Sequence, residues 1–381
     1  MAREQTSRVP RAFWIPQPLS EHYLPGTDRK TPYPSGTPPP VRTTHEIRVG
    51  DAREADVDAD SVDLVVTSPP YPMVEMWDET FAAQSPAVAE ALSAGDGEAA
   101  FEAMHTLLDD VWERVVGALR DGGVVAVNVG DATRRVDGNF RLYPNHARVV
   151  EALSALGLQQ LPGIVWRKPT NSVAKFMGSG TLPTNAYATL EHEHVLLFRK
   201  GGTRSFPPND ADRYASAFFW EERNEWFSDR WEFRGTGQDV EDGRRERSGA
   251  FPLELPLRLV RMYSVRDDTV FDPFVGTGTT SLAALLEGRS SLGVERDPEL
   301  AAAFEERAAE APALSTEQAR ERLRRHREFV ADNEGTVNYE ARHYDTRVVT
   351  ESEREIRLPT VKRVERVGEG PLRLSATHEP L

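Results

Sequence analysis

Residues 269–287 read TVFDPFVGTGTTSLAALLE, and this stretch decides the fold. The β-branched and aromatic run over 269–272 predicts a strand, and an apolar helix is expected behind the turn, over 279–287. Gly276 and Gly278 stand in that turn, where a residue without a side chain lets a ligand approach the backbone. Because open α/β sheets bind ligands at the carboxyl ends of their parallel strands, the stretch predicts a sheet strand, a ligand-binding turn and a crossover helix.

Further short apolar runs alternate with amphipathic stretches along the chain. One such stretch, 101–119, carries apolar residues at three- and four-residue steps and ends at Asp121-Gly122-Gly123, which is typical of a helix that buries one face. Strands that alternate with helices form parallel sheets, so we predict a doubly wound, mostly parallel α/β fold. The expected strands besides 269–272 are 46–49, 62–67, 124–129, 161–167, 194–199 and 291–295.

The chain divides by composition into three parts. Residues 1–42 are rich in proline and are expected to form an extended arm without a catalytic role. Residues 43–300 are expected to form one catalytic domain, in which the polar, aromatic-rich stretch 202–250 looks like an insertion. Residues 301–381 are expected to form a charged helical extension, with one helix over 315–333, followed by a polar tail.

The absence of cysteine limits the chemistry that the chain can perform. Without thiols there are no disulfides, no thiolate nucleophile and no zinc held by cysteine, so catalysis has to use oxygen, nitrogen and backbone groups. The chain also lacks an apolar run long enough to cross a membrane, and its start lacks the apolar stretch of a secretory signal. We therefore expect a cytoplasmic protein without a membrane anchor.

The net charge of −15 argues at first against a nucleic-acid partner, because phosphate binding normally uses Lys and Arg. Lysine occurs only at positions 30, 168, 175, 200 and 362, whereas arginine is plentiful, which is typical of a salt-adapted protein from a GC-rich source. In molar salt the Debye length falls to about 3 Å, so acidic surface far from a site would scarcely repel DNA. Charge alone leaves open an acidic protein without a nucleic-acid partner and a salt-adapted protein that binds DNA.

An acidic residue ends the strand that is expected after the glycine turn. It is Glu295, 19 residues beyond Gly276, and an acid at this place can accept hydrogen bonds from ribose hydroxyls. A dinucleotide-binding turn has a third glycine where this chain has Ser281, so a cofactor with adenosine and no phosphate fits better than a pyrophosphate. The alternative is a tight turn in which Asp272 caps the helix and the glycines serve geometry alone.

A second turn follows the strand 62–67 and reads Ser68-Pro69-Pro70-Tyr71. The two prolines stiffen the turn and remove two backbone donors, so that nearby carbonyl groups can point into a pocket. The Ser68 hydroxyl and the Pro69 carbonyl could hold an exocyclic base amine, while the Tyr71 ring stacks on a base swung out of a duplex. No strong base is needed, because the amine can lose its proton after it attacks a methyl donor placed in line. The alternative is a rigid turn with a surface tyrosine.

Together the two turns resemble the motifs of the DNA amino-methyltransferases, which methylate N4 of cytosine or N6 of adenine. TSPPY at 67–71 is similar to the catalytic motif of this family and FDPFVGTGTT at 271–280 to its cofactor motif. Because the catalytic motif comes first, the order resembles the circularly permuted β class. Further stretches match in the family's order and extend the resemblance over about residues 46–300: Gly50-Asp51, DGGVVAVNVGD at 121–131, IVWRKPTN at 164–171, EHEHVLLFRKG at 191–201 and FPLELPLRLV at 251–260.

The resemblance implies a Rossmann-like methyltransferase sheet, S-adenosyl-L-methionine as the cofactor and double-stranded DNA as the substrate. It implies that the catalytic residues are Ser68, Pro69, Pro70 and Tyr71. The cofactor-binding residues that it implies are Asp51, Asp272, Phe274, Gly276, Thr277, Gly278, Thr279, Thr280 and Glu295.

The resemblance also bears on the target base. Serine rather than aspartate at position 68 is more typical of N4-cytosine enzymes in this family, which leaves N6-adenine methylation as the alternative. TSPPYPMVEMWD at 67–78 is similar to modification methylases that act on CTAG. A noncatalytic DNA-binding relative is a remote alternative, since none of the motif residues is damaged.

The residues expected to read DNA lie in 202–250, where arginine and aromatic side chains alternate, with 132–145 as a second candidate. The expected DNA contacts are Arg167, Lys168, Arg244 and Arg245, and the tryptophans that could fill a vacated base position are Trp220, Trp226 and Trp231. For Arg244 and Arg245 the alternative is a solvated charged loop.

Two histidines bear on metal binding, one at the start of the expected strand 194–199 and one two residues before it. His192 and His194 are predicted to face opposite sides of the strand, so we expect no metal site. The recognition sequence, a homodimer and a cognate restriction endonuclease stay open.

Overall fold

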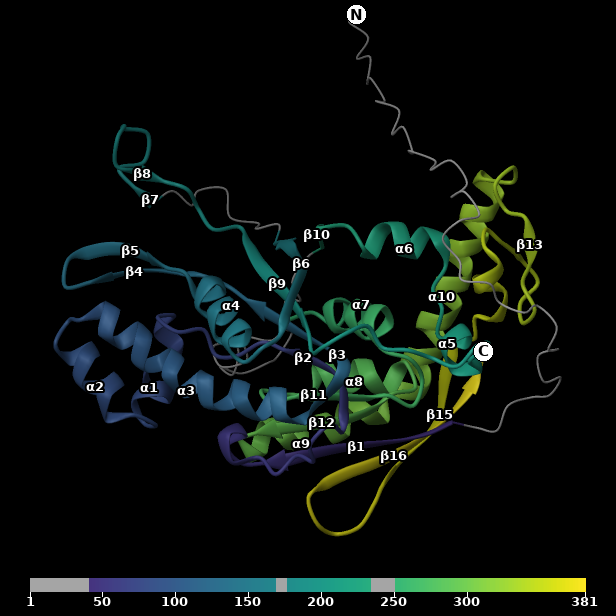
Figure 1. Cartoon of the computed structure of the whole chain (residues 1–381), viewed down its shortest axis with the longest axis horizontal. Helices are drawn as coiled ribbons and strands as arrows, with labels where there is room; N and C mark the ends of the chain where they lie inside the picture. Colours follow the sequence, from purple (N-terminus) through teal and green to yellow (C-terminus); the bar gives the residue numbers. More distant parts are fainter. Residues whose placement is uncertain (1–40, 169–176, 234–250) are drawn as a thin grey trace, which may run out of the picture.

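A ten-stranded sheet runs through the centre of the molecule (Figure 1). The computed structural model describes residues 41–168, 177–233 and 251–381. The strands of the sheet, in chain order, are β1 (Val41–Val49), β2 (Val62–Thr67), β3 (Leu119–Val129), β6 (Gln159–Arg167), β9 (His192–Arg199), β10 (Arg230–Glu232), β11 (Thr269–Asp272), β12 (Ser290–Glu295), β15 (Pro359–Arg366) and β16 (Leu372–Pro380). All seven strands expected from the apolar runs are therefore present.

The strands lie in the order β10-β6-β9-β3-β2-β11-β12-β1-β16-β15. Every neighbouring pair from β3 through β1 is parallel, and β6 is parallel to β10. Strands β9 and β16 run antiparallel to both of their neighbours. The prediction of a doubly wound, mostly parallel α/β fold is confirmed.

Helices cover both faces of this sheet (Figure 1). On one face α3 (Gly97–Ala118) and α4 (Asn145–Ala155) pack over a core that includes Val65 of β2. On the other face α7 (Glu254–Tyr263), α8 (Thr279–Leu286) and α9 (Pro298–Ala309) enclose a second core, which includes Leu64 and Val66. Because successive side chains of a strand point to opposite faces, one apolar strand supplies both cores.

Shorter elements surround the two layers. They are η2 (Ala52–Glu54), η3 (Glu75–Trp77), α1 (Asp78–Ala82), α2 (Pro86–Ser93), β4 (Ala132–Val136), β5 (Asn139–Tyr143), β7 (Met177–Gly178), β8 (Ala186–Tyr187), α5 (Ala211–Ala215), α6 (Trp220–Trp226), α10 (Ala311–Asp332), β13 (Tyr339–Glu340), β14 (Arg347–Val348) and η5 (Glu351–Glu355). Two hairpins, β4–β5 and β7–β8, project from the body on the same side of the molecule (Figure 1). No helix within the described ranges is long and apolar enough to cross a membrane.

The segment expected to be a polar tail differs from that expectation. Its strands β15 and β16 extend the central sheet, and β16 pairs with β1 from Val41↔His378 to Ile47↔Leu372. Leu374, Ala376 and His378 alternate along β16 and are all buried. The period-two pattern was hard to recognise in the sequence because the third buried position is a histidine, which leaves only Leu374 and Ala376 as apolar residues among the three.

Candidate active site

The sheet has a topological switch point between β2 and β11, which lie side by side and parallel, with Val65 opposite Phe271. From β2 the chain passes through α3 to β3 on one side, and from β11 it passes through α8 to β12 on the other side. Connections that diverge in this way leave a crevice at the carboxyl ends of the two strands. The Ser68 turn and the glycine turn both lie at that edge.

Asp272 ties the two turns together. Its Oδ1 accepts a hydrogen bond of 2.6 Å from the Thr67 hydroxyl, at the end of β2, and another of 3.0 Å from the backbone N–H of Phe274. Its Oδ2 accepts 2.7 Å from the Thr280 hydroxyl, in the first turn of α8. Burial raises the pKa of Asp272 to about 6 although these hydrogen bonds lower it. The two turns, which are about 200 residues apart in the sequence, therefore lie side by side.

The two glycines of the cofactor turn have different surroundings. Both have positive φ, +53° at Gly276 and +82° at Gly278. A Cβ at Gly278 would lie 2.5 Å from the Phe304 ring, whereas a Cβ at Gly276 would meet nothing within 4 Å. Gly278 is therefore required by packing against α9, while Gly276 borders open space that a ligand can occupy.

Glu295 closes the other side of this turn. Its Oε2 accepts 2.9 Å from the backbone N–H of Gly276, and its Oε1 accepts 2.9 Å from that of Asp297. Its backbone carbonyl accepts from the N–H of Gly50, which places Asp51 directly after β1 at the same edge. A carboxylate has about four acceptor sites, so Glu295 can still accept hydrogen bonds from ribose hydroxyls.

The remaining predicted cofactor residues lie at the same edge, and several already have partners. Both carboxylate oxygens of Asp51 bind the Arg53 guanidinium, and these hydrogen bonds lower the pKa of Asp51. Arg307 donates 3.0 Å hydrogen bonds to the hydroxyls of Thr277 and Thr279, which fixes the outer side of the turn against α9. These threonine hydroxyls therefore support the turn in this structure.

The catalytic turn is anchored by one tyrosine hydroxyl. Tyr71 donates to Glu193 Oε2 at 3.1 Å and accepts from the Asn128 amide at 3.0 Å. Ser68 Oγ lies 3.0 Å from the same hydroxyl oxygen. A tyrosine has one proton, and because it goes to Glu193, Ser68 must be the donor towards Tyr71. The lone pairs of Ser68 then stay free to accept.

Glu193 is the charged centre of this cluster. Besides Tyr71 it accepts 2.6 Å from the Asn128 amide and forms an ion pair with Lys168. Burial and the Glu193 charge raise the pKa of Tyr71 well above its usual value, so the phenol stays neutral. Neither Asn128 nor Glu193 was singled out from the sequence. Antiparallel β9 begins where parallel β3 ends, and this brings its amino end to the catalytic edge.

The predicted DNA contacts in the described part of the chain carry ion pairs. Arg167 is half exposed and lies 3.4 Å from Glu191 and 3.3 Å from Glu232. Lys168, besides its pair with Glu193, lies over the Trp166 ring at 4.6 Å. The other two predicted contacts, Arg244 and Arg245, lie outside the described residues.

Two tryptophans of the stretch 202–250 belong to the interior. Trp226 and Trp231 are 4% and 1% exposed, and the Trp231 indole donates to the Trp226 carbonyl at 2.9 Å. The expectation that they could fill a vacated base position is wrong, because both are taken up by packing at the β10 edge of the sheet. Trp220 begins α6 and is half-buried.

The prediction for His192 and His194 is also wrong. Their ring centroids lie 4.9 Å apart, because residues two apart on a strand share a face. His194 instead lies with Asp131 and His146 in one cluster of side chains.

Comparison with known proteins agrees with this geometry. A family model described as DNA methylase matches residues 62–306. The type II methyltransferase M.MthZI of Methanothermobacter thermautotrophicus is 44% identical over 324 residues, which are 84% of this chain and 91% of that protein. M.MjaI of Methanocaldococcus jannaschii is 46% identical over 279 residues, which are 70% of this chain and 92% of that protein.

A solved structure shows the same fold. The DNA modification methylase TTHA0409 of Thermus thermophilus, in complex with S-adenosyl-L-methionine, is 34% identical with a TM-score of 0.54, covering 70% of this chain and 93% of that one. The matched family model spans both turns of the crevice, from β2 to α9. The chain therefore belongs to the DNA methylase family of S-adenosyl-L-methionine-dependent DNA amino-methyltransferases.

Proposed function

We propose that the chain transfers a methyl group from S-adenosyl-L-methionine to the exocyclic N4 amine of a cytosine swung out of duplex DNA. The observation that carries the proposal is the 2.6 Å hydrogen bond from Thr67 to Asp272, since it joins the strand that ends at Ser68 to the strand that ends at the glycine turn. A methyl donor bound at the turn and an amine held at Ser68 would lie in one crevice, ready for in-line transfer.

The chain's part in the reaction is to hold the amine. Ser68 donates its own proton to Tyr71, so its lone pairs and the Pro69 carbonyl can accept the two amine N–H groups. The cofactor supplies an electrophilic methyl group on a sulfonium. On transfer the amine nitrogen would form a bond to the methyl carbon as the carbon–sulfur bond breaks, sulfur would keep the electron pair, and the amine would then release a proton to water.

Tyr71 is proposed to stack on the target base. Its hydroxyl is held by Asn128 and Glu193, and its ring lies against Gly130, where an added Cβ would be 3.0 Å from Tyr71 Cε2. A ring fixed at both its hydroxyl end and its edge is already oriented before a base arrives, which lowers the entropic cost of stacking.

The hairpins β4–β5 and β7–β8 are proposed as part of the DNA-binding surface. Phe140 and Tyr187 stack at 5.0 Å and link the two hairpins. Arg135 and Arg141 are exposed on β4–β5, which falls within the candidate stretch 132–145. Exposed arginines can bind phosphates or guanine edges. The stretch 202–250 stays a prediction, because 234–250 lies outside the described residues.

One assay tests the target base and the site together. The full chain is incubated with labelled cofactor and duplex DNA from low to molar salt, and the product is digested to nucleosides and analysed by mass spectrometry. We expect N4-methylcytosine, and duplexes with and without CTAG test the similarity of residues 67–78 to CTAG methylases. N6-methyladenine would overturn the assignment of the base. DNA binding without methylation at any salt concentration would instead indicate the noncatalytic relative.

The proposed partners have separate tests. Size-exclusion chromatography with light scattering tests a homodimer. Protection of methylated DNA against endonucleases that cut the modified site tests a link to restriction.

A further inference from the structure

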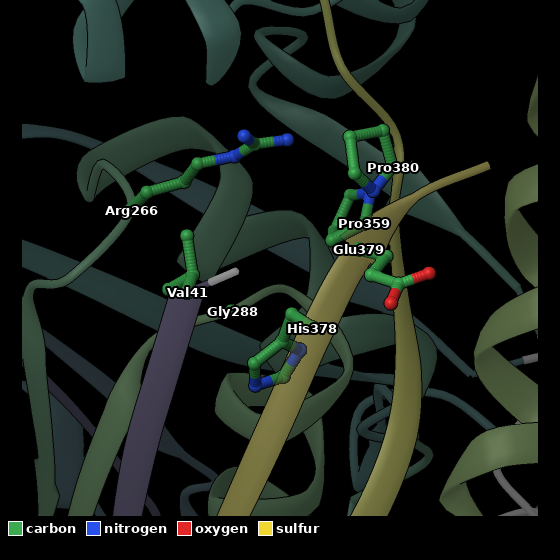
Figure 2. A pocket seen from close by; sticks show the side chains of 7 residues that line it. All are labelled: Val41, Arg266, Gly288, Pro359, His378, Glu379 and Pro380. Atoms are coloured by element: carbon green, nitrogen blue, oxygen red, sulfur yellow. The ribbon is translucent and has the colours of Figure 1, made fainter. Parts of the chain in front are cut away.

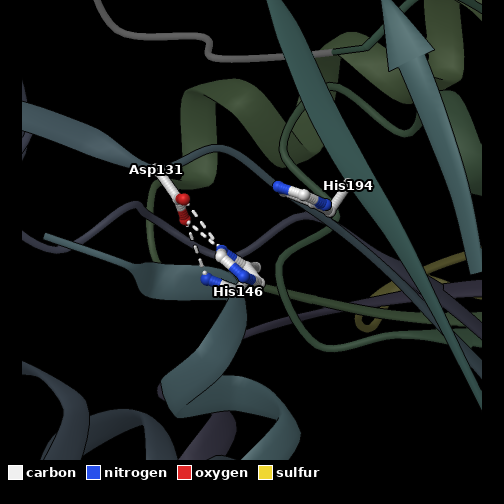
Figure 3. A group of neighbouring side chains, drawn as sticks. All are labelled: Asp131, His146 and His194. Carbon is white, nitrogen blue, oxygen red and sulfur yellow. Dashed lines mark hydrogen bonds and ion pairs between the residues drawn. The ribbon is translucent and has the colours of Figure 1, made fainter. Parts of the chain in front are cut away.

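Three potential metal ligands meet beside the catalytic turn, on the side of β9 that faces α4 (Figure 3). Asp131 follows β3, His146 is the second residue of α4, and His194 is in β9. One ligand atom of each lies within 4.8 Å of the others. Figure 3 shows the Asp131 carboxylate pointing at the His146 ring, with His194 next to it.

Hydrogen bonds and sheet pairing hold the backbone around this cluster. Asp131 Oδ1 accepts 3.0 Å from the His146 backbone N–H and 2.8 Å from His146 Nδ1, which holds the carboxylate at the start of α4. The Asn145 amide donates to the carbonyl of Gly130, one residue before Asp131, at 3.0 Å. His194 is held by the register of the sheet, opposite Val129. All three ligands therefore project from fixed positions.

We propose that Asp131, His146 and His194 bind a divalent first-row transition metal, with Zn²⁺ as the expected ion. Two imidazoles and one carboxylate suit zinc, cobalt or nickel, whereas Mg²⁺ and Ca²⁺ prefer oxygen ligands throughout. Three protein ligands leave a fourth tetrahedral position for water. The inference concerns a site outside the methyl-transfer crevice and does not depend on the proposed target base.

Binding requires a small rearrangement of the rings. Zinc–ligand bonds of about 2.1 Å place tetrahedral ligand atoms roughly 3.4 Å apart. This separation lies between the 2.8 Å from Asp131 Oδ1 to His146 Nδ1 and the 4.8 Å within which the ligand atoms of all three residues lie. The two rings stack with centroids 4.2 Å apart and 23° between their planes. A ring nitrogen binds in its own plane, so the rings must turn out of the stack to share an ion. The His146 side chain is 34% exposed, which leaves it room to turn.

The site would act on the catalytic turn through adjacent residues. Gly130 precedes Asp131 and lies close enough to Tyr71 that an added Cβ would be 3.0 Å from its ring, and Glu193 precedes His194 and accepts from Tyr71. An ion would join the end of β3, the start of α4 and the start of β9, which together hold Tyr71. We expect bound metal to raise the unfolding temperature and to order this turn.

Spectroscopy of the full chain tests the site. The chelator-treated protein is titrated with Co²⁺, whose visible absorption bands report tetrahedral nitrogen and oxygen ligands, and Zn²⁺ binding is measured by equilibrium dialysis. We expect one ion per chain, and binding at least about tenfold weaker in His146→Ala and Asp131→Asn. His192→Ala is the matched control, because His192 touches His194 but lies outside the cluster.

The metal affinities of the two ligand variants and of the control decide whether the proposed site exists. Loss of binding in His146→Ala and Asp131→Asn, with binding kept in His192→Ala, supports the site. Absence of stoichiometric binding, binding unchanged in both ligand variants, or equal loss in the control overturns it. Unfolding of metal-free His146→Ala at the wild-type temperature excludes misfolding as the cause of a loss, since this side chain is partly exposed.

Discussion

At the scale of single residues, the hydrogen bond that the Tyr71 hydroxyl donates determines which group donates in the other hydrogen bond of the catalytic turn. The Tyr71 proton goes to Glu193, so the Ser68 proton goes to Tyr71 and the Ser68 lone pairs stay free to accept. The carboxylate thus acts on Ser68 through the phenol, without touching a substrate. This makes Glu193 a positioning residue, and Lys168 balances its charge.

Replacing this carboxylate should slow turnover. In Glu193→Gln the hydrogen bond from Tyr71 is no longer charge-assisted, and we expect kcat to fall about 10- to 100-fold. Affinity for the cofactor should not change, because Glu193 does not touch the glycine turn. Glu191→Gln, two residues earlier on the same edge, is the control and should keep its kcat. A drop in cofactor affinity equal to the drop in kcat would contradict the positioning role.

Removing the tyrosine ring tests the proposed stacking. Tyr71→Ala takes away both the ring and the proton acceptor of Ser68, and we expect methylation to be abolished while cofactor affinity, measured by calorimetry, is kept. Tyr71→Phe restores the ring alone and should recover part of the activity. If Tyr71→Ala loses cofactor binding as well, the residue has a folding role.

At the scale of elements, the two glycines of the cofactor turn should separate stability from binding. Gly278→Ala forces a side chain into positive φ and into Phe304, so the free energy of unfolding should fall by at least about 2 kcal/mol. Gly276→Ala meets no neighbour and should lose only about 1 kcal/mol, but its methyl group would occupy the open space at the crevice. We expect about tenfold weaker cofactor binding in Gly276→Ala.

Urea denaturation and calorimetry of the two variants give these quantities. Equal stability of Gly276→Ala and Gly278→Ala would show that the contact with α9 does not constrain the turn. Unchanged cofactor affinity in Gly276→Ala would place the ligand elsewhere in the crevice.

The elements that the sequence predicted are those with strong periodicity. The seven expected strands are apolar runs of the central sheet, whereas the juxtaposition of the two turns depends on the pairing of β2 with β11. The periodicity of apolar residues in a strand does not show whether the strand runs parallel or antiparallel to its neighbours. Glu193 and Asn128 could therefore not be placed at the site before β9 was known to be antiparallel. The aromatic residues around Trp226 and Trp231 are compatible with DNA contact and with core packing. In the structure both tryptophans are buried in the core.

At the scale of the whole molecule, a buried histidine network joins the two ends of the described chain. Thr43 Oγ1 lies 2.8 Å from Nε2 of both His45 and His378, and His45 Nδ1 lies 2.9 Å from Ser291 Oγ. His378 also lines a small pocket with Val41, Arg266 and Pro359 between β1 and the last strands (Figure 2). Burial, together with His378, lowers the pKa of His45 to about 3, and burial, with nearby arginines, lowers that of His378 to about 4.

These shifts predict a stability that falls with acid. Both histidines are neutral in the folded state, whereas in the unfolded chain they take up protons below about pH 6.5, so the unfolded state binds more protons between pH 6.5 and the folded pKa values. Stability should therefore be highest above pH 6.5 and decline as the pH falls towards 4 and 3. Asp272 acts in the opposite sense, because its pKa is raised to about 6.

Comparing the stability of wild type and a His378 variant at several pH values isolates the contribution of this histidine to the pH dependence. Urea unfolding of wild type and His378→Gln is compared between pH 7 and 4, since glutamine can keep a hydrogen bond to Thr43 without titrating. The variant should lose less stability on acidification than wild type, and exposed His192→Gln should follow wild type. Parallel profiles for wild type and His378→Gln would contradict the assignment.

The pairing of β16 with β1 has a consequence for biosynthesis. The earliest described strand, β1, receives one of its two neighbours from the last described strand, β16, and the Leu381 amide bonds back to the Leu358 carbonyl at 2.9 Å. A nascent chain still inside the ribosomal tunnel leaves that flank of β1 bare. Completion of the sheet must wait until β16 has left the ribosome, and a nonsense mutation before this strand would release a chain with an uncovered β1 ready to pair with another copy.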